Sequence, residues 1–179
     1  SAPERRAELQ QAHAFAKDLD HPNLLKMGEF GEHDGAAYFT TEDFEAPTLR
    51  ELIQEFRIAG RPFRVKEASQ IITQVLEAVA ATNEAGKVIR ALRPEYVSVK
   101  VRHTGPRQQT MVANVKLFGI GFWDLIPSAT LAEDEFTRSE AQYLAPELKS
   151  FQPVATERSD VFSAGVIFYE MLVGHAPVG

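Results

Sequence analysis

Between residues 87 and 97 the chain reads KVIRALRPEYV, and this stretch decides the fold. An amphipathic helix is predicted before it, at 67–85, because apolar residues recur there at helical spacing and Gly86 supplies a stop. After it, at 97–102, valines alternate with polar residues, which is typical of a half-buried strand. The stretch is therefore predicted to be a loop that joins a buried helix to a strand.

Three further segments carry information of the same kind. They read KLFGIG at 116–121, AQYLAPE at 141–147 and ERSDVFSAGVIFYEMLVG at 157–174. The last of these is apolar on nearly every face, which predicts a buried helix. We expect Ser159 or Asp160 to cap the start of that helix.

The remaining segments predict a helix followed by two hairpins. The helix covers 3–19 and stops before Pro22, and two strands follow at 24–30 and 36–41. Thr48 is the expected N-cap of a short helix at 49–56. A second hairpin is expected from 97–102 and 112–118. Its basic turn at 103–109 is interpreted as solvated, with contact to a partner as the alternative.

Together these segments resemble the protein kinase family, and in particular bacterial serine/threonine kinases. In that family the loop that matches 89–96 reads His-Arg-Asp-Leu-Lys-Pro-Glu-Asn, and the segment that matches 116–121 reads Lys-Leu-x-Asp-Phe-Gly. The resemblance implies an α+β, protein-kinase-like, two-lobed fold. Residues 1–42 would form a partial N-lobe with helix C and strands 4 and 5. Residues 43–179 would form a mainly α-helical C-lobe truncated after helix F.

Four positions depart from the family's catalytic pattern. Ala91 stands where the family has its catalytic Asp. Tyr96 and Gly119 replace the Asn and the Asp that hold Mg²⁺. Ala12 falls at the helix C glutamate, with Glu8 one turn earlier as an alternative. Alanine cannot accept a proton and a phenol is a poor magnesium ligand, so we expect no catalytic residue, no metal site and no cofactor.

Other positions keep residues to which the family gives structural roles. The resemblance implies that Arg90 can clamp a phosphate, that Glu147 belongs to the closing motif, and that Asp160 binds the backbone of the loop. Thr137 and Ser139 are candidate phosphoacceptors in the activation segment.

The resemblance also implies where a nucleotide would lie if one bound. Thr41 falls at the gatekeeper position, Glu42 and Phe44 fall in the hinge, and Ser98 falls beneath the adenine ring. A hydroxyl at Ser98 weakens the apolar sandwich around a base. ATP is therefore not expected as a cofactor.

Composition argues against several classes of function. The 179 residues carry a formal net charge of −6, which does not favour nucleic-acid binding. The absence of cysteine suits a reducing compartment, and the longest apolar run, 161–173, is too short to span a bilayer. His13, His21 and His33 show no metal-ligand spacing and are interpreted as surface or turn residues.

These observations predict a catalytically inactive, kinase-like module with a regulatory or scaffolding role in the cytoplasm, and not an enzyme. Its expected partner is a kinase, a signalling protein or a membrane-associated protein, with tethering at the inner membrane through other parts of the parent protein as an option. Two alternatives stay open. One is a metal-independent nucleotide-binding sensor. The other is a weakly active, atypical serine/threonine kinase in which Asp124 or Glu95 supplies a metal ligand.

Overall fold

The computed structural model describes residues 2–90, 92–104, 110–121, 141–150 and 152–177. In chain order its helices and strands are α1 (Ala2–Asp18), β1 (Met27–His33), β2 (Ala36–Thr41), α2 (Leu49–Ile58), α3 (Val65–Glu84), β3 (Val97–Thr104), β4 (Thr110–Leu117) and α4 (Glu157–Val173). Three short 3-10 helices are η1 (Pro94–Tyr96), η5 (Ala141–Tyr143) and η6 (Pro146–Lys149). Helices together with two-stranded antiparallel sheets confirm the predicted α+β class.

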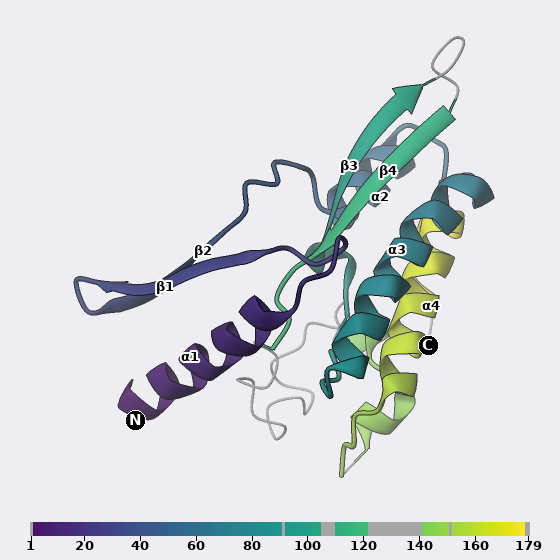
Figure 1. Ribbon diagram of the computed structural model, residues 1–179. Coiled ribbons are helices and arrows are strands. Elements are labelled where there is room, and N and C mark those ends of the chain that lie inside the picture. The colour runs from purple at the N-terminus through teal and green to yellow at the C-terminus, as the bar shows by residue number, and fades with distance from the viewer. Residues whose placement is uncertain (1, 91, 105–109, 122–140, 151, 178–179) are drawn as a thin grey trace.

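The main core lies where α2, α3, α4 and the β3–β4 hairpin meet. Figure 1 shows α3 and α4 side by side, with the hairpin rising beside α3 and α1 extending from the centre toward the lower left. The stripe of α3 predicted from its apolar spacing is buried here except for Leu76, which is exposed, and one side of α4 is buried as well. The largest fully buried apolar side chains of this core are Leu49, Ile71, Val75, Ile89, Leu92, Val97, Val99, Val115, Leu117, Ile167 and Met171.

The first hairpin packs against α1 through a buried histidine. The ring of His13 lies 5.5 Å from that of Phe30 and 6.2 Å from that of Phe39, measured between centroids. Its Nε2 is 3.1 Å from the carbonyl oxygen of Gly28. The interpretation of His13 as a surface residue is therefore wrong, because the strands supply an aromatic pocket and a backbone partner for the ring.

The second hairpin runs in continuous register from Val97 opposite Leu117 to Thr104 opposite Thr110. Side-chain amides of α3 form hydrogen bonds with the backbone groups on the outer edge of β4. Gln70 Oε1 accepts from the Ala113 amide, Gln74 Oε1 accepts from the Val115 amide, and Gln74 Nε2 donates to the Ala113 carbonyl. The helix thus takes the place that a third strand would have.

Several boundaries differ from those expected. The strand predicted at 24–30 begins at Met27 and runs to His33. Its first residues instead join the end of β4, where the Leu25 amide bonds the Leu117 carbonyl at 2.9 Å. The N-cap of α4 is Thr156, whose amide donates to Ser159 Oγ, so neither Ser159 nor Asp160 is the cap. Among the described residues, no helix is long and apolar enough to cross a membrane.

Candidate functional site

The loop between α3 and β3 is anchored from α4 by Asp160, whose side chain is completely buried. Its carboxylate accepts hydrogen bonds from the backbone amides of Ile89 at 2.9 Å and Arg90 at 2.8 Å, and from Asn83 Nδ2 at 3.1 Å. Burial raises the pKa of the Asp160 carboxyl, although these three donors pull it in the opposite direction. The structure thus brings Asp160 to the backbone that the resemblance assigns to it.

Arg90 has a backbone conformation that non-glycine residues rarely adopt, with φ at +70°. Such a conformation persists only where surrounding contacts impose it, and the Asp160 hydrogen bond to the Arg90 amide is one such contact. Ala91, the position of the family's catalytic Asp, lies outside the described residues. The candidate phosphoacceptors Thr137 and Ser139, and the carboxylate of Asp124, also lie outside them.

Further along the loop, Arg93 and Tyr96 form a pair. Arg93 is buried, and its guanidinium donates a hydrogen bond to the Tyr96 hydroxyl. The guanidinium carbon also lies 4.7 Å from the centroid of the Tyr96 ring. The Tyr96 hydroxyl, at the position of the family's metal-binding Asn, therefore accepts a hydrogen bond from an arginine of the same loop.

The segment after β4 passes directly beneath α1. Gly119 and Gly121 have φ of +86° and +81°. A Cβ added at Gly121 would lie 3.1 Å from the carbonyl oxygen of Ala12. The structure thus brings the helix C position, Ala12, onto this segment, whereas Glu8 is exposed. Ile120 is buried in the main core cluster.

The four candidate nucleotide residues come from β2, the hinge and β3. Glu42 Oε1 lies 2.7 Å from Lys116 Nζ and accepts from the Lys26 amide at 2.8 Å. Burial alone would raise the pKa of Glu42, but these contacts outweigh burial and lower it. Ser98 lies opposite Lys116 in the hairpin, so Ser98 and Glu42 share this lysine as a neighbour. Thr41 ends β2, and the Phe44 ring lies 5.7 Å from Lys100 Nζ.

A second cluster of charges lies behind the loop and was missed by sequence reasoning. Arg50 of α2 binds Glu95 at 2.8 Å and Glu170 at 2.6 Å, and also donates to the Tyr143 hydroxyl. Burial and the neighbouring Glu170 raise the pKa of Tyr143. The one available signal was Glu170, a carboxylate inside an otherwise apolar helix, which needs a buried partner. Its partner Arg50 is 120 positions away, too far for a local pattern to reveal.

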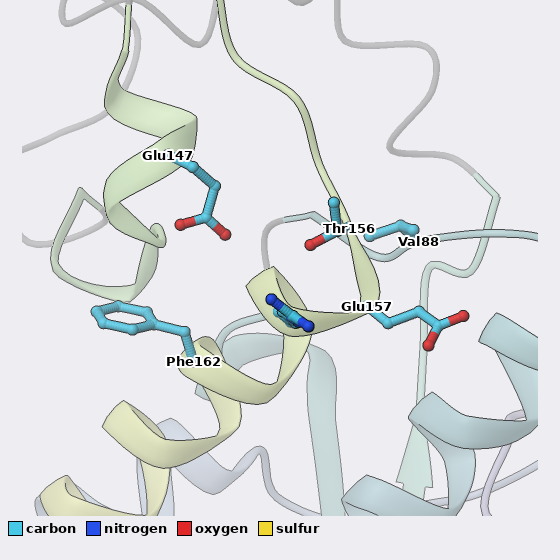
Figure 2. A pocket seen from close by; sticks show the side chains of 6 residues that line it. Val88, Glu147, Thr156, Glu157 and Phe162 are labelled. Carbon is cyan, nitrogen blue, oxygen red and sulfur yellow. The ribbon is translucent and has the colours of Figure 1, made fainter.

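A pocket of about 760 Å³ lies between the loop, η6 and the start of α4. It is lined by Val88, Glu147, Thr156, Glu157, Arg158 and Phe162. Figure 2 shows Glu147 and Phe162 on one side and Val88 and Thr156 on the other. Ser159 Oγ donates to Glu147 Oε1 at 2.6 Å, and this bond holds the pKa of Glu147 below its usual range. Glu147 is thereby tied to the first turn of α4, close to Asp160.

The comparisons with known proteins agree on the family that this chain resembles. The chain matches the protein kinase domain family over residues 3–179. It is 30% identical over 162 residues to serine/threonine-protein kinase PrkC of Bacillus subtilis, covering 90% of this chain and 23% of that protein. It is 29% identical over 168 residues to the probable serine/threonine-protein kinase PknB of Lactococcus lactis, covering 93% of this chain and 24% of that protein. The chain thus spans about a quarter of the length of these relatives.

These comparisons overturn one expectation from the sequence. A catalytically inactive module that is not an enzyme was expected, whereas these relatives are named as serine/threonine-protein kinases. That expectation is therefore wrong, and the alternative of a weakly active, atypical kinase is better supported. The error came from giving four substituted positions more weight than the rest of the matched sequence. With a match that extends over residues 3–179, the chain belongs to the protein kinase domain family.

Proposed function

We propose that the chain is part of a bacterial-type serine/threonine protein kinase with weak, atypical phosphotransferase activity. The observation that carries the proposal is the family match over residues 3–179, together with relatives that are named as serine/threonine-protein kinases. The Asp160 anchor supports it, because phosphoryl transfer depends chiefly on positioning, and this contact holds the loop backbone at Ile89 and Arg90.

The substitutions at the site explain why the proposed activity is weak. Tyr96 and Gly119 bring no carboxylate or amide oxygen, and Ala91 has no polar side-chain atom. The described residues do not by themselves fit a magnesium ion, since no group of three or more His, Cys, Asp or Glu side chains gathers among them. Glu95 is engaged by Arg50, which leaves Asp124 as the candidate ligand from the sequence.

Arg93 is a candidate to contribute charge. It stands where the family has the lysine of its loop, and its guanidinium is held by the Tyr96 hydroxyl. A planar guanidinium can bind phosphoryl oxygens through two hydrogen bonds, and it keeps its charge at any pH relevant to proteins. We propose that Arg93 binds the transferred group and partly replaces the electrostatic contribution of the missing ligands.

A phosphotransfer assay tests the proposal. The 179-residue chain is incubated with γ-labelled ATP and dephosphorylated casein, with Mg²⁺ and with Mn²⁺. We expect slow incorporation of label on serine or threonine. Asp124→Ala should reduce the rate strongly, whereas the matched control Asp134→Ala should leave it nearly unchanged. No incorporation above that of a heat-denatured sample would refute the proposal, and equal rates in both variants would remove Asp124 from it.

The proposal extends to the setting of the protein. A protein substrate or signalling partner and a cytoplasmic location fit a kinase of this type. Thr137 and Ser139 stay candidate sites for phosphorylation, and mass spectrometry of the labelled chain would show whether either is modified.

A further inference from the structure

Within the part of the chain that the structure describes, the β3–β4 hairpin has one edge that is covered and one that is largely open. The edge of β4 is satisfied by Gln70 and Gln74 of α3. Among the described residues, the edge of β3 is covered only near its start, where the Val99 amide donates to the Pro47 carbonyl at 2.9 Å and Ser98 forms an isolated β-bridge with Thr48. Figure 1 shows that the chain between β2 and α2 then turns away, while the hairpin continues beyond α2 and α3.

The register of the hairpin shows which backbone groups face the open edge. Val99 lies opposite Val115, and both amides bond groups outside the hairpin, so this is a pair whose backbone groups point outward. Because the pattern alternates along an antiparallel ladder, Val101 and His103 also point their N–H and C=O groups outward. Among the described residues, no backbone partner is found for these groups on the β3 side.

The side chains beside this edge give it a charge opposite to that of the whole chain. Lys100 and Arg102 are exposed on one face of β3, and His103 is exposed on the other. The chain as a whole has a formal net charge of −6. Lysine and arginine on an edge oppose pairing with a second identical edge, because like charges would face each other. The same charges favour a strand that carries carboxylates.

We propose that the open edge of β3, at Val101 and His103, binds an extended acidic segment of a partner protein by strand addition. The backbone groups of these two residues would pair with the added strand, and Lys100 and Arg102 would lie beside its Glu or Asp side chains. The proposal does not depend on phosphotransfer. It assigns the hairpin a docking role for an acidic, extended segment of a substrate or signalling protein.

Fluorescence anisotropy with a synthetic peptide tests this proposal. The probe is a fluorescein-labelled peptide of sequence Glu-Val-Glu-Val-Glu-Val-Glu, and the protein is the 179-residue chain. We expect saturable binding that Val101→Pro weakens about tenfold, because the substitution removes one outward N–H and leaves the bonds to β4 intact. Arg102→Glu should weaken binding by about as much, whereas the matched control Arg57→Glu on α2 should not.

Two further peptides separate strand addition from simple charge attraction. One has the same sequence with alternate amides N-methylated, and the other carries lysine in place of each glutamate. The proposal expects neither to bind. Equal binding of the N-methylated peptide would show a purely electrostatic contact and overturn strand addition. Absence of binding by the first probe would overturn the proposal. Concentration-dependent dimerisation that is lost in Val101→Pro would also overturn the proposal, because it would assign the edge of β3 to a second copy of the chain.

Discussion

Gly121 lies directly beneath the backbone of Ala12, so close that a Cβ added at Gly121 would come 3.1 Å from the Ala12 carbonyl oxygen and 3.6 Å from its Cα. This contact joins α1 to the segment that follows β4. The contact requires glycine for two reasons. There is no room for a Cβ, and the φ of +81° is one that residues with a Cβ rarely adopt. The position of α1 and the course of the segment are therefore coupled.

Gly121→Ala should destabilise the chain and displace α1. The strained φ alone costs about 1–2 kcal/mol, and the close contact with Ala12 adds to it. Gly35→Ala is the matched control, because Gly35 has φ of +77° but no heavy atom within 4 Å of the added Cβ. Urea unfolding measures both variants. Equal losses of stability would show that α1 does not press on Gly121.

Arg50→Met should be among the most damaging substitutions behind the loop. It leaves Glu170, which is 5% exposed, without its cationic partner, and breaking a buried ion pair costs about 3–5 kcal/mol. Chemical denaturation gives the change in the free energy of unfolding. Adding Glu170→Gln should recover part of the loss, and Arg57→Met on the exposed side of α2 serves as the control. A loss no larger than that of the control would contradict the role assigned to the pair.

Asp160→Asn should loosen the loop while leaving the shape of the side chain unchanged. The variant turns one acceptor oxygen into a donor that faces donors, so we expect a loss of about 1–3 kcal/mol. Hydrogen exchange at the Ile89 and Arg90 amides should accelerate more than exchange in the middle of α3. Glu157→Gln, in the exposed first turn of the same helix, is the control. Unchanged protection of the two loop amides would disprove the anchor.

The Glu42–Lys116 pair should make a pH-dependent contribution to stability. Because the folded pKa of Glu42 is lowered, its contribution is present above the unfolded value near 4.5 and is lost as pH falls through the folded pKa. Glu42→Gln should cost less than about 1 kcal/mol at neutral pH, since the pair is partly exposed. The difference from the parent chain should vanish in acid. Thermal unfolding between pH 3 and 7 measures this difference, with Glu45→Gln as the control. A stability difference between Glu42→Gln and the parent chain that stays constant across this pH range would contradict the prediction.

Gln74→Ala should expose the edge of β4. The substitution removes the side-chain partner of the Val115 amide and of the Ala113 carbonyl, and each unsatisfied buried group costs about 1–3 kcal/mol. Asn23 Nδ2 also loses Gln74 but keeps the Val115 carbonyl as an acceptor. The Val115 amide should exchange with solvent faster. Gln54→Ala on the exposed face of α2 is the control. Unchanged exchange at Val115 would show that the hydrogen bond to Gln74 does not protect this amide.

Local patterns predicted much of the fold because they report which residues must be buried. The apolar pattern of α4, the stripe of α3 and the alternation of β3 all led to confirmed elements. The full burial expected for α4 is wrong, because Val161, Phe162 and Tyr169 on one side of the helix are exposed. The same reasoning misplaced His13, since its pocket is built by Phe30 and Phe39 from strands that follow it in the chain. It also misplaced the start of β1, because Leu25 pairs with β4 and not with β2.

The candidate site was less predictable for a related reason. Substituted positions such as Tyr96 and Gly119 can be read from a sequence, but what replaces the lost groups depends on contacts made in three dimensions. The pairing of Arg93 with Tyr96, and of Arg50 with Glu95 and Glu170, appears only in the structure. The inference of an inactive module rested on what the site lacks, and it took no account of these arginines.

The hydrogen bonds from the loop to Asp160 come from main-chain amides of Ile89 and Arg90 and not from their side chains. The anchor is thus made to atoms that every residue except proline carries, so it does not depend on which side chains stand at residues 89 and 90. Gly119 differs, because its φ of +86° ties the backbone itself to glycine, and an aspartate there would require the chain to turn differently.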